Sequence, residues 1–482
     1  MATLGKSFFW LFGAEFLFYL SGYVVHMGAG RILGVEDYGK YSLVITITLI
    51  IANLVGAGLP IAMGKFLSAS YAKGDQEMVF LIKRRIALWQ SIFMFLAGGI
   101  FFLSAPLLAS FLGDSSLTEL FWIASFIIPL YGADLYYFHY YSGLKYFHIQ
   151  SILKFVRALL RMTVIIGLAY WFHLAGIIAG YLIVPFFIFL LAWQLDKERK
   201  FEKKDSKEIA TFSFHDVLSL AGATTIFLVI FEILISFDMY VLKYTTGDDV
   251  LVGEYSSALT IARIPTFLFY ALTIILLPTI SEARVFKSFK KAKMLITLAL
   301  RFMLFLTIPF VVILSVYAEP VIRLLFGSQF SGASSFLMIL SSAMGFLTVL
   351  YVCGFAFIGA GKGYIPAGIA TSALVLNGAL LFLGAEKYGT LGFVGVKLFV
   401  AILVFFAVLF FIYRVFGAHL LFREIGISVF AGVVIYGIAC LFPISILYLF
   451  VISPIIFSLY VGILLYFKVL SQEDLQVVKN KI

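Results

Sequence analysis

The chain has 482 residues, of which 63% are hydrophobic and only 12% are charged, and its mean hydropathy is +1.08. Soluble domains carry about 25% charged residues, so this composition excludes an ordinary soluble protein and predicts one that crosses a membrane many times. The formal net charge of +10 would suit a nucleic-acid-binding protein, but the placement of the basic residues favours another explanation.

Apolar runs separated by charged residues, glycines or prolines predict an all-α polytopic membrane protein with fourteen transmembrane helices. The first run is longer than the apolar core of a signal peptide and a second follows directly, so we interpret it as a span rather than a cleaved leader. The predicted spans are 7–29, 41–63, 86–111, 117–138, 150–171, 174–195, 217–243, 255–280, 294–318, 331–358, 364–384, 391–413, 421–441 and 444–467.

Lysine and arginine are unequally divided between the two sides of these spans. If the N-terminus is cytoplasmic, roughly two thirds of the 35 basic residues fall in cytoplasmic segments. The outer segments hold only Arg31, Lys40, Lys243, Arg323 and Lys387. This bias predicts a multi-pass plasma-membrane protein with both termini in the cytoplasm. Because it also accounts for most of the basic excess, nucleic acid is not expected as a partner.

Short motifs recur along the chain at nearly constant spacing. Gly39-Lys40-Tyr41 is matched by Gly253-Glu254-Tyr255, and Phe111-Leu112-Gly113 is matched at the same spacing by Leu325-Phe326-Gly327. Each match falls at the same topological position in its half. The pattern indicates two copies of a six-helix unit with the same orientation, because six spans return the chain to its starting side.

Parallel repeats of this kind are typical of alternating-access transporters with a substrate site between the halves. We therefore predict a central cavity between two six-helix lobes. The predicted parts are an N-lobe at 1–195, a cytoplasmic linker at 196–216, a C-lobe at 217–415, and two further helices with a tail at 416–482.

The sequence contains no motif that indicates an enzyme. The segment from Gly359 to Gly363 lacks the spacing and the following Ser or Thr of a nucleotide-binding loop, and no histidine or cysteine cluster suggests a metal. The external segments are too short for a catalytic domain. We expect a non-enzymatic transporter without a cofactor, driven by something other than its own nucleotide hydrolysis, such as H⁺ or Na⁺ coupling.

An ionisable side chain inside the bilayer costs free energy, so each such residue is first considered as a functional one. Lys154, Arg157 and Arg161 lie on one face of the fifth span, since their spacing is i, i+3 and i+7. They form either an inward basic face that binds an anionic substrate or a set of interfacial anchors. Glu15 on the first span is predicted to line the cavity.

A second group lies on the seventh and eighth spans. Counted from the outer turn, Arg263 falls in depth between Glu232 and Asp238. We predict that Arg263 binds an anion and that one carboxylate exchanges H⁺ or Na⁺. The alternative is that Arg263 and a carboxylate form an ion pair whose role is only structural. Arg301 and Lys397 are interpreted as interfacial anchors.

Two further features concern contacts between helices and the shape of single helices. Asp134 is interpreted either as a functional group or as a hydrogen-bonding contact between helices. The glycines and proline from Gly56 to Pro60, and Pro265 with Pro278, occupy comparable positions in the two repeats and predict bends in both second helices.

These segments carry a family resemblance. The stretches GRILGVEDYGKYSLVITITLIIANLVGAGLPIAMGK, EYSSALTIARIPTFLFYALTIILLPTISEA and LLFGSQFSGASSFLMILS resemble the polysaccharide-transporter flippases (O-antigen and oligosaccharide-lipid flippases) of the multidrug/oligosaccharidyl-lipid/polysaccharide (MOP) exporter superfamily. The resemblance implies fourteen helices around a cavity lined largely by spans 1, 2, 7 and 8, which here carry Glu15 and Arg263. It also implies that a polyprenyl diphosphate- or dolichol-type phosphate-linked oligosaccharide moves from the cytoplasmic to the outer leaflet.

The partners expected from the resemblance are this lipid-linked oligosaccharide, membrane lipids and glycan assembly enzymes. Peptidoglycan-precursor flippases have a strongly basic first helix, whereas this chain has Glu15 there, which argues against lipid II as the substrate. The alternative function is a cation-coupled small-molecule exporter of the same superfamily. The arginines favour an anionic lipid-linked substrate.

Overall fold

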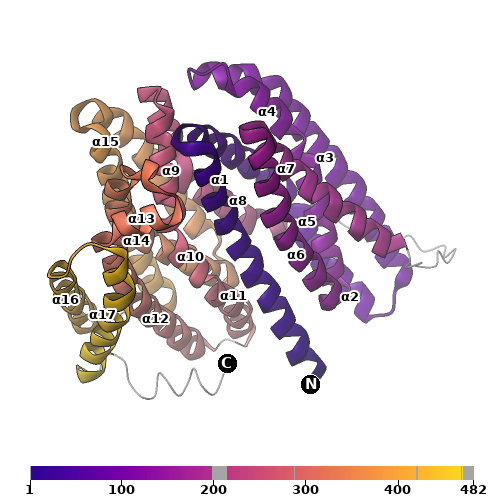
Figure 1. Ribbon diagram of the computed structural model, residues 1–482. Helices are drawn as coiled ribbons and strands as arrows, with labels where there is room; N and C mark the ends of the chain where they lie inside the picture. The colour runs from indigo at the N-terminus through magenta and orange to yellow at the C-terminus, as the bar shows by residue number, and fades with distance from the viewer. Residues whose placement is uncertain (1, 198–213, 287, 419–421, 468, 470–482) are drawn as a thin grey trace. The chain divides into compact units, whose positions relative to one another are not determined.

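The computed structural model describes the chain except for residues 1, 198–213, 287, 419–421, 468 and 470–482. Every secondary-structure element in the described part is helical, as predicted (Figure 1). Most of the predicted linker, 196–216, lies outside the described residues. The chain forms two compact units, Met1–Gly253 and Glu254–Ile482.

The first unit is a bundle in which each long apolar run of the sequence becomes a helix. α8, which follows the predicted linker, packs on α1 and α2 of this unit. The helices are α1 (Ala2–Gly56), α2 (Gly58–Ala72), α3 (Gln76–Phe111), α4 (Leu117–Ser125), α5 (Ile127–Gly143), α6 (Phe147–Leu160), the π-helical turn η1 (Arg161–Ile165), α7 (Ile166–Lys197) and α8 (Phe214–Thr246).

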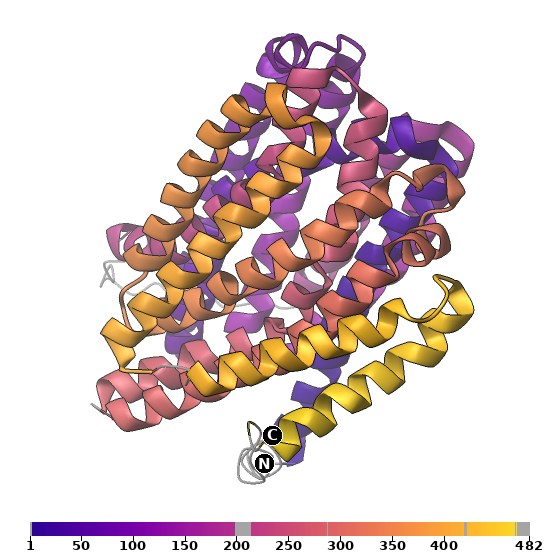
Figure 2. The ribbon, with the colours of Figure 1, turned by 90° about the vertical axis from the view of Figure 1, so that its left-hand side faces the viewer.

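The second unit is built around α14, whose side chains are largely buried and which packs on α11, α12 and α15. The last two helices, α16 and α17, run beside each other and beside α12 (Figure 2). The helices are α9 (Asp249–Ala262, which begins at the end of the first unit), α10 (Ile264–Leu268), α11 (Tyr270–Val285), α12 (Phe289–Val316), α13 (Ala318–Leu325), the 3₁₀ turn η2 (Ser328–Phe330), α14 (Ala333–Gly359), α15 (Tyr364–Phe416), α16 (Phe422–Cys440) and α17 (Ile446–Tyr466).

Three predicted turns between spans are sharp backbone reversals within a continuous helical stretch. They lie at Gly34 (φ 82°) in α1, His173 (φ 48°) in α7 and Gly389 (φ 59°) in α15. Glycine adopts positive φ without steric cost, which explains two of the three sites. His173 adopts a positive φ although it is not glycine, which costs free energy, and it lies at an exposed turn.

Both second helices are interrupted in the regions where bends are predicted. The predicted span 41–63 is interrupted at Ala57, between α1 and α2. The predicted span 255–280 is interrupted at Arg263 and again at Phe269, and Pro265 stands in the first turn of α10. Pro278, by contrast, lies inside α11 without ending it.

Eleven helical stretches of the described residues are long and apolar enough to cross a membrane. The two longest, Gly13–Ala72 and Phe147–Lys197, have 60 and 51 residues, so each is far longer than the about 20 residues that a bilayer requires. The molecule is therefore a multi-pass membrane protein, as its composition predicts.

The prediction for one basic residue of the second unit is wrong. Lys397 on α15 is predicted to be an interfacial anchor, but it is only 1% exposed and lies inside the unit. Arg301 on α12 donates to Glu424 of α16 at 2.6 Å while its side chain is 26% exposed, and its assignment as an interfacial anchor stays a prediction.

Candidate functional site

The three cations on α6 and η1 do share one helical face, and that face points into the first unit. Lys154 donates to Glu15 of α1, and Arg157 pairs with Asp134 of α5. The side chains of Lys154 and Arg157 are only 13% and 16% exposed. These two residues therefore make ion pairs inside the helix bundle and are not directed at lipid headgroups.

Aromatic rings complete the surroundings of this basic face. The guanidinium carbons of Arg157 and Arg161 each lie 4.9 Å from the ring centre of Phe18 on α1, and the ammonium of Lys154 lies 4.0 Å from that of Phe138 on α5. Cation–π contacts of this kind are stronger where water is scarce. We call Glu15, Asp134, Lys154, Arg157 and Arg161 the α6 charge cluster.

Arg161 occupies a special position in this cluster, because the π-helical turn η1 begins at this residue. Single π turns inside α-helices are rare and are frequently found at functional sites. A Cβ atom at Gly180 of α7 would come within 2.8 Å of Ile165 Cα, so α7 packs closely on the turn. On the other side, a Cβ atom at Gly22 of α1 would lie 3.5 Å from Arg161 Nη2, an ordinary van der Waals distance, so the guanidinium lies directly against α1.

The other predicted site residues are distributed over both units. Glu232 and Asp238 lie on α8 in the first unit, where Asp238 is fully buried and Glu232 partly buried. Arg263 lies in the second unit, partly buried, at the break between α9 and α10. The structure thus gathers Glu15, Arg157 and Arg161 in one cluster, whereas the combination of Arg263 with the two α8 carboxylates stays a prediction.

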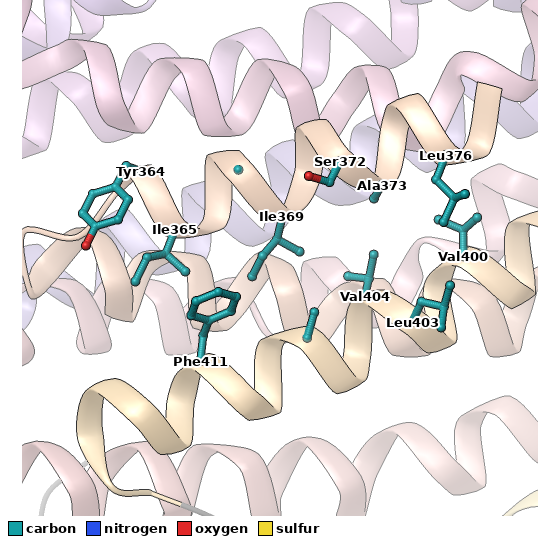
Figure 3. Close-up of a pocket in the computed structure, with 12 residues that line it drawn as sticks. Tyr364, Ile365, Ile369, Ser372, Ala373, Leu376, Val400, Leu403, Val404 and Phe411 are labelled. Atoms are coloured by element: carbon teal, nitrogen blue, oxygen red, sulfur yellow. The ribbon is translucent and has the colours of Figure 1, made fainter. Parts of the chain in front are cut away.

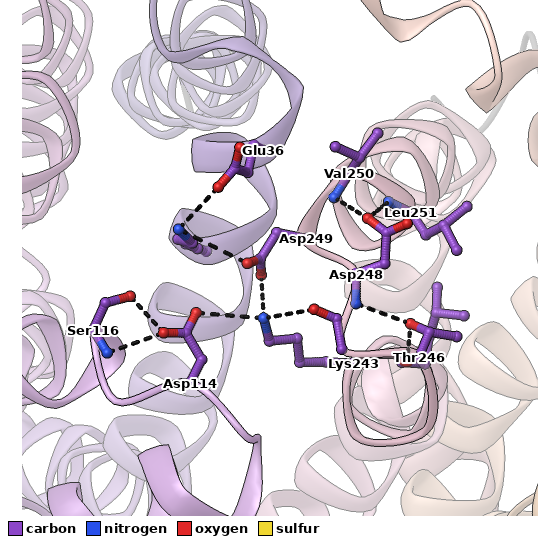
Figure 4. A network of polar contacts seen from close by, with 12 residues as sticks. Glu36, Asp114, Ser116, Lys243, Thr246, Asp248, Asp249, Val250 and Leu251 are labelled. Atoms are coloured by element: carbon purple, nitrogen blue, oxygen red, sulfur yellow. Dashed lines mark hydrogen bonds and ion pairs between the residues drawn. The ribbon is translucent and has the colours of Figure 1, made fainter.

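A second polar cluster, which the sequence did not reveal, surrounds Lys243 at the end of α8 (Figure 4). The Lys243 side chain is 2% exposed and its Nζ lies 2.7 Å from Asp249 Oδ1 and 3.3 Å from Asp114 Oδ2. Lys40 continues the cluster, with its Nζ 3.8 Å from Asp249 Oδ2 and 3.2 Å from Glu36 Oε1. We call these five residues the Lys243 network; it joins α1, the turn after α3 and the turn between α8 and α9.

The two aspartates of this network have opposite pKa shifts. Burial alone would raise the pKa of Asp114, but hydrogen bonds from Ser116 and the charge of Lys243 bring it below its ordinary value. Burial raises the pKa of Asp249 above its ordinary value, and Lys243 and Lys40 offset only part of that effect. The ionised form is therefore favoured at Asp114 and disfavoured at Asp249.

The Lys243 network lies beside a close helix crossing that involves both copies of the repeated glycine motif. A Cβ atom at Gly39 of α1 would collide with the carbonyl oxygen of Asp249, and one at Gly253 of α9 would collide with the carbonyl oxygen of Val35. Only glycine permits this approach of two backbones. The sequence showed that the two glycines correspond, but not that they meet.

The partners of Lys243 have no local signature in the sequence. Lys243 stands where an apolar span meets a polar turn, a position that predicts an outer cation. The alternation of Lys and Asp around Gly247 is a local signal, but it does not identify Asp114 as a partner. Asp134, for which the sequence allows two interpretations, is the ion-pair partner of Arg157.

A cavity of about 440 Å³ lies between the two halves of α15 (Figure 3). Apart from Tyr364 and Ser372, its lining side chains are apolar, and it contains no charged residue. It suits a hydrocarbon chain and not a charged headgroup. Among the described residues, no cluster of His, Cys, Asp and Glu could hold a metal ion.

Comparison with known proteins identifies the family. The family model described as polysaccharide biosynthesis protein matches residues 4–284, which is more than half of the chain. Stage V sporulation protein B of Bacillus subtilis (strain 168) is 22% identical over 362 residues, covering 70% of this chain and 69% of that protein.

Solved structures share the fold at low sequence identity. The lipid II flippase MurJ, in an inward closed conformation, superposes with a TM-score of 0.74 at 18% identity and covers 95% of this chain and 98% of its own. A multidrug resistance MATE family transporter of the MOP superfamily, in an inward-facing conformation, has a TM-score of 0.66 at 16% identity, covering 82% and 95%. These structures show a shared fold, and the family model shows the family: this chain belongs to the polysaccharide biosynthesis protein family.

Proposed function

We propose that this protein is a flippase that carries an oligosaccharide linked to a polyprenyl phosphate or diphosphate from the cytoplasmic to the outer leaflet by alternating access. The observation that carries the proposal is the α6 charge cluster, in which three cations and two carboxylates lie within membrane-spanning helices. Its excess of positive charge suits an anionic substrate. The family, and the fold shared with the lipid II flippase MurJ, support a lipid-linked one.

The physical task explains why such a cluster is useful. A phosphate-sugar headgroup cannot cross hydrocarbon unaided, because an unpaired buried charge costs several kcal/mol or more. Arginine guanidinium groups bind phosphate through two parallel hydrogen bonds and remain charged at every physiological pH. The hydrocarbon tail of the carrier can stay in the lipid while the headgroup passes through a polar path in the protein.

We further propose fourteen spans, arranged as an N-lobe, a C-lobe and two additional helices, with both termini in the cytoplasm. The reversals at Gly34 and His173 support this count, because each divides a helical stretch that is too long for one crossing. The broken segment 249–285, formed by α9, α10 and α11, supplies one further crossing. A central cavity between the lobes, lined in part by Glu15 and Arg263, belongs to the same proposal.

In this scheme Arg263 receives a phosphate of the substrate, and Glu232 or Asp238 exchanges the coupling H⁺ or Na⁺. The protein acts without a catalytic step of its own, and glycan assembly enzymes supply its substrate on the cytoplasmic side. The second candidate, a cation-coupled small-molecule exporter, is favoured by the fold shared with the MATE transporter. The net positive charge of the α6 charge cluster favours the anionic lipid.

The decisive experiment reconstitutes the protein in liposomes that contain a fluorescent polyprenyl diphosphate-linked oligosaccharide. A membrane-impermeant glycosidase or quencher then reports which leaflet holds the headgroup. We expect the outer-accessible fraction to rise in protein-containing vesicles and to stay constant in protein-free vesicles. The flippase proposal fails if headgroup accessibility is equal in vesicles with and without the protein. If an imposed proton gradient then drives uptake of an organic cation, the protein is the exporter.

A further inference from the structure

The three basic residues of the α6 charge cluster are not equivalent. We propose that, within the α6 charge cluster, Arg161 is the residue that binds a phosphate group of the substrate, and that Lys154 and Arg157 are positioning residues held by Glu15 and Asp134. This inference rests on the proposed function, because it assigns one part of that site. It differs from the sequence-based prediction, in which Lys154, Arg157 and Arg161 act together as one basic face and Glu15 lines the cavity.

The first argument is the pairing of charges. Glu15 accepts a hydrogen bond from Lys154, and Asp134, which is 7% exposed, pairs with Arg157. Among the residues that the structure describes, Arg161 makes no direct ion pair, and its charge acts on Asp134 only at longer range. Three cations share two carboxylates, so the cluster keeps one excess positive charge, and Arg161 is the member without a carboxylate of its own.

The second argument is the way in which Arg161 is held. The ring of Phe18 lies against its guanidinium carbon at 4.9 Å, and its terminal nitrogens lie beside Gly22 of the same helix. A stacked guanidinium keeps its in-plane N–H donors available, so it can still form a bidentate contact with an oxyanion. The side chain is therefore oriented by an interaction that does not use its hydrogen-bonding capacity.

The third argument is the backbone. The π-helical turn η1 begins at Arg161, and α7 fixes it from behind, where Gly180 packs on Ile165. A π turn inserts one extra residue into the helix and thereby shifts the following side chains around its axis. Among the described residues, Arg161 thus combines an irregular helical turn, contact with an aromatic ring and the absence of a direct ion pair. A purely structural arginine does not require this combination.

The fourth argument concerns Lys154 and Arg157. Removing either from its carboxylate would leave an uncompensated charge at low exposure, so these pairs resist separation. They shape the cluster and set its net charge without being free to follow a substrate. The ligand chemistry assigned to Arg161 is a phosphate oxyanion, which both a monophosphate-linked and a diphosphate-linked carrier provide.

The test is a binding measurement on the full chain in lipid nanodiscs with two soluble probes, geranyl phosphate and geranyl diphosphate. We expect Arg161→Gln to weaken binding of both probes about tenfold or more, as expected for the loss of a charge-assisted bidentate contact. Arg161→Lys keeps the positive charge but loses the paired N–H donors of the guanidinium. Its affinity for both probes should therefore lie between those of Arg161→Gln and the wild type. The preferred probe identifies the carrier as monophosphate or diphosphate.

The matched control is Arg414→Gln, because Arg414 also stacks on a phenylalanine ring, with its guanidinium carbon 5.5 Å from the centre of Phe410. This variant should bind both probes like the wild type. Glu15→Gln raises the net charge of the cluster by one, so it should improve binding of the diphosphate more than of the monophosphate. Thermal unfolding and gel filtration of each variant exclude loss of the fold as the cause.

Unchanged probe affinity in Arg161→Gln overturns the assignment, and so does a wild-type protein that binds neither probe. The liposome assay separates this outcome from failure of the proposed function. If the wild type flips the lipid-linked oligosaccharide and Arg161→Gln flips it equally well, the flippase stands and the phosphate lies elsewhere. If the probes depend on Arg161 but no flipping occurs, the anion site stands and the proposed function fails.

Discussion

Gly39 and Gly253 meet where α1 crosses α9, and a Cβ atom built on Gly39 would lie 3.0 Å from the backbone nitrogen of Gly253. Each glycine also faces the carbonyl oxygen of a residue four positions before the other, Asp249 and Val35. The contact is thus reciprocal, and it involves the two copies of a motif that recurs in the sequence. A duplicated element here packs against its own copy.

This crossing predicts a strict requirement for glycine. We expect Gly253→Ala to destabilise the protein by about 1–3 kcal/mol, because the new methyl group meets backbone rather than a movable side chain. Thermal or denaturant unfolding of the purified protein in detergent measures the change. Gly99→Ala on α3 is the matched control, since nothing lies within 4 Å of its Cβ position. Equal stability of the two variants would contradict the tight crossing.

The Lys243 network predicts a large loss of stability when its central cation is removed. Lys243→Met leaves Asp114 and Asp249 without the ammonium that joins them, at 16% and 11% exposure. Breaking a buried ion pair from one side costs about 3–5 kcal/mol. Lys243→Arg keeps the charge and should lose less. If adding Asp249→Asn to Lys243→Met restores no stability, the pair does not act as the distances indicate.

The two aspartates of the network are predicted to titrate in a fixed order. A carboxyl group with a lowered pKa in the folded state, such as Asp114, stabilises the fold above its unfolded pKa, and this contribution is lost as the pH falls through the folded value. One with a raised pKa, such as Asp249, favours the fold at low pH, and this contribution is lost as the pH rises through the folded pKa.

Acidification should therefore protonate Asp249 before Asp114. Infrared difference spectra of protein labelled with ¹³C-aspartate can follow the two carboxylates during a pH titration. Asp249→Asn should delete the step at higher pH and leave the step at lower pH in place. Loss of the lower step instead would reverse the assignment.

Arg263 provides the test of the second unit. We expect Arg263→Ala to abolish flipping in liposomes while the protein still inserts in the membrane, because a partly buried arginine at a helix break is placed to bind an anion. Arg323→Ala is the control, because the Arg323 side chain is 57% exposed and, within the described part of the chain, pairs with Glu319 on the same helix. Wild-type flipping by Arg263→Ala would remove Arg263 from the proposed path.

The sequence predicted the helices and the basic face well because both depend on local periodicity. Apolar length defines a span whatever it packs against, and residues spaced like Lys154, Arg157 and Arg161 share a face in any α-helix. Glycine and proline marked the bends for the same reason. These signals require no knowledge of neighbouring helices.

Ion-pair partners that are distant in the sequence cannot be predicted from local periodicity. Nothing local connects Lys154 with Glu15 or Lys243 with Asp114, and hydropathy cannot separate a lysine at the membrane surface from one that is 2% exposed, like Lys243. The π turn at Arg161 also has no periodic signature. The error for Lys397 has the same origin, since burial of a charge depends on what the other helices supply.

The pairing of α6 with α1 has a consequence for biogenesis. A helix with three cations enters a bilayer from the translocon only at considerable cost, whereas one whose charges are met by Glu15 and Asp134 does so much more readily. The first span, which carries Glu15, must therefore remain beside the translocon until α6 has been synthesised. Membrane integration of this protein is then a cooperative event between segments made at different times, and a nascent chain that carries Glu15→Leu should release α6 poorly into lipid.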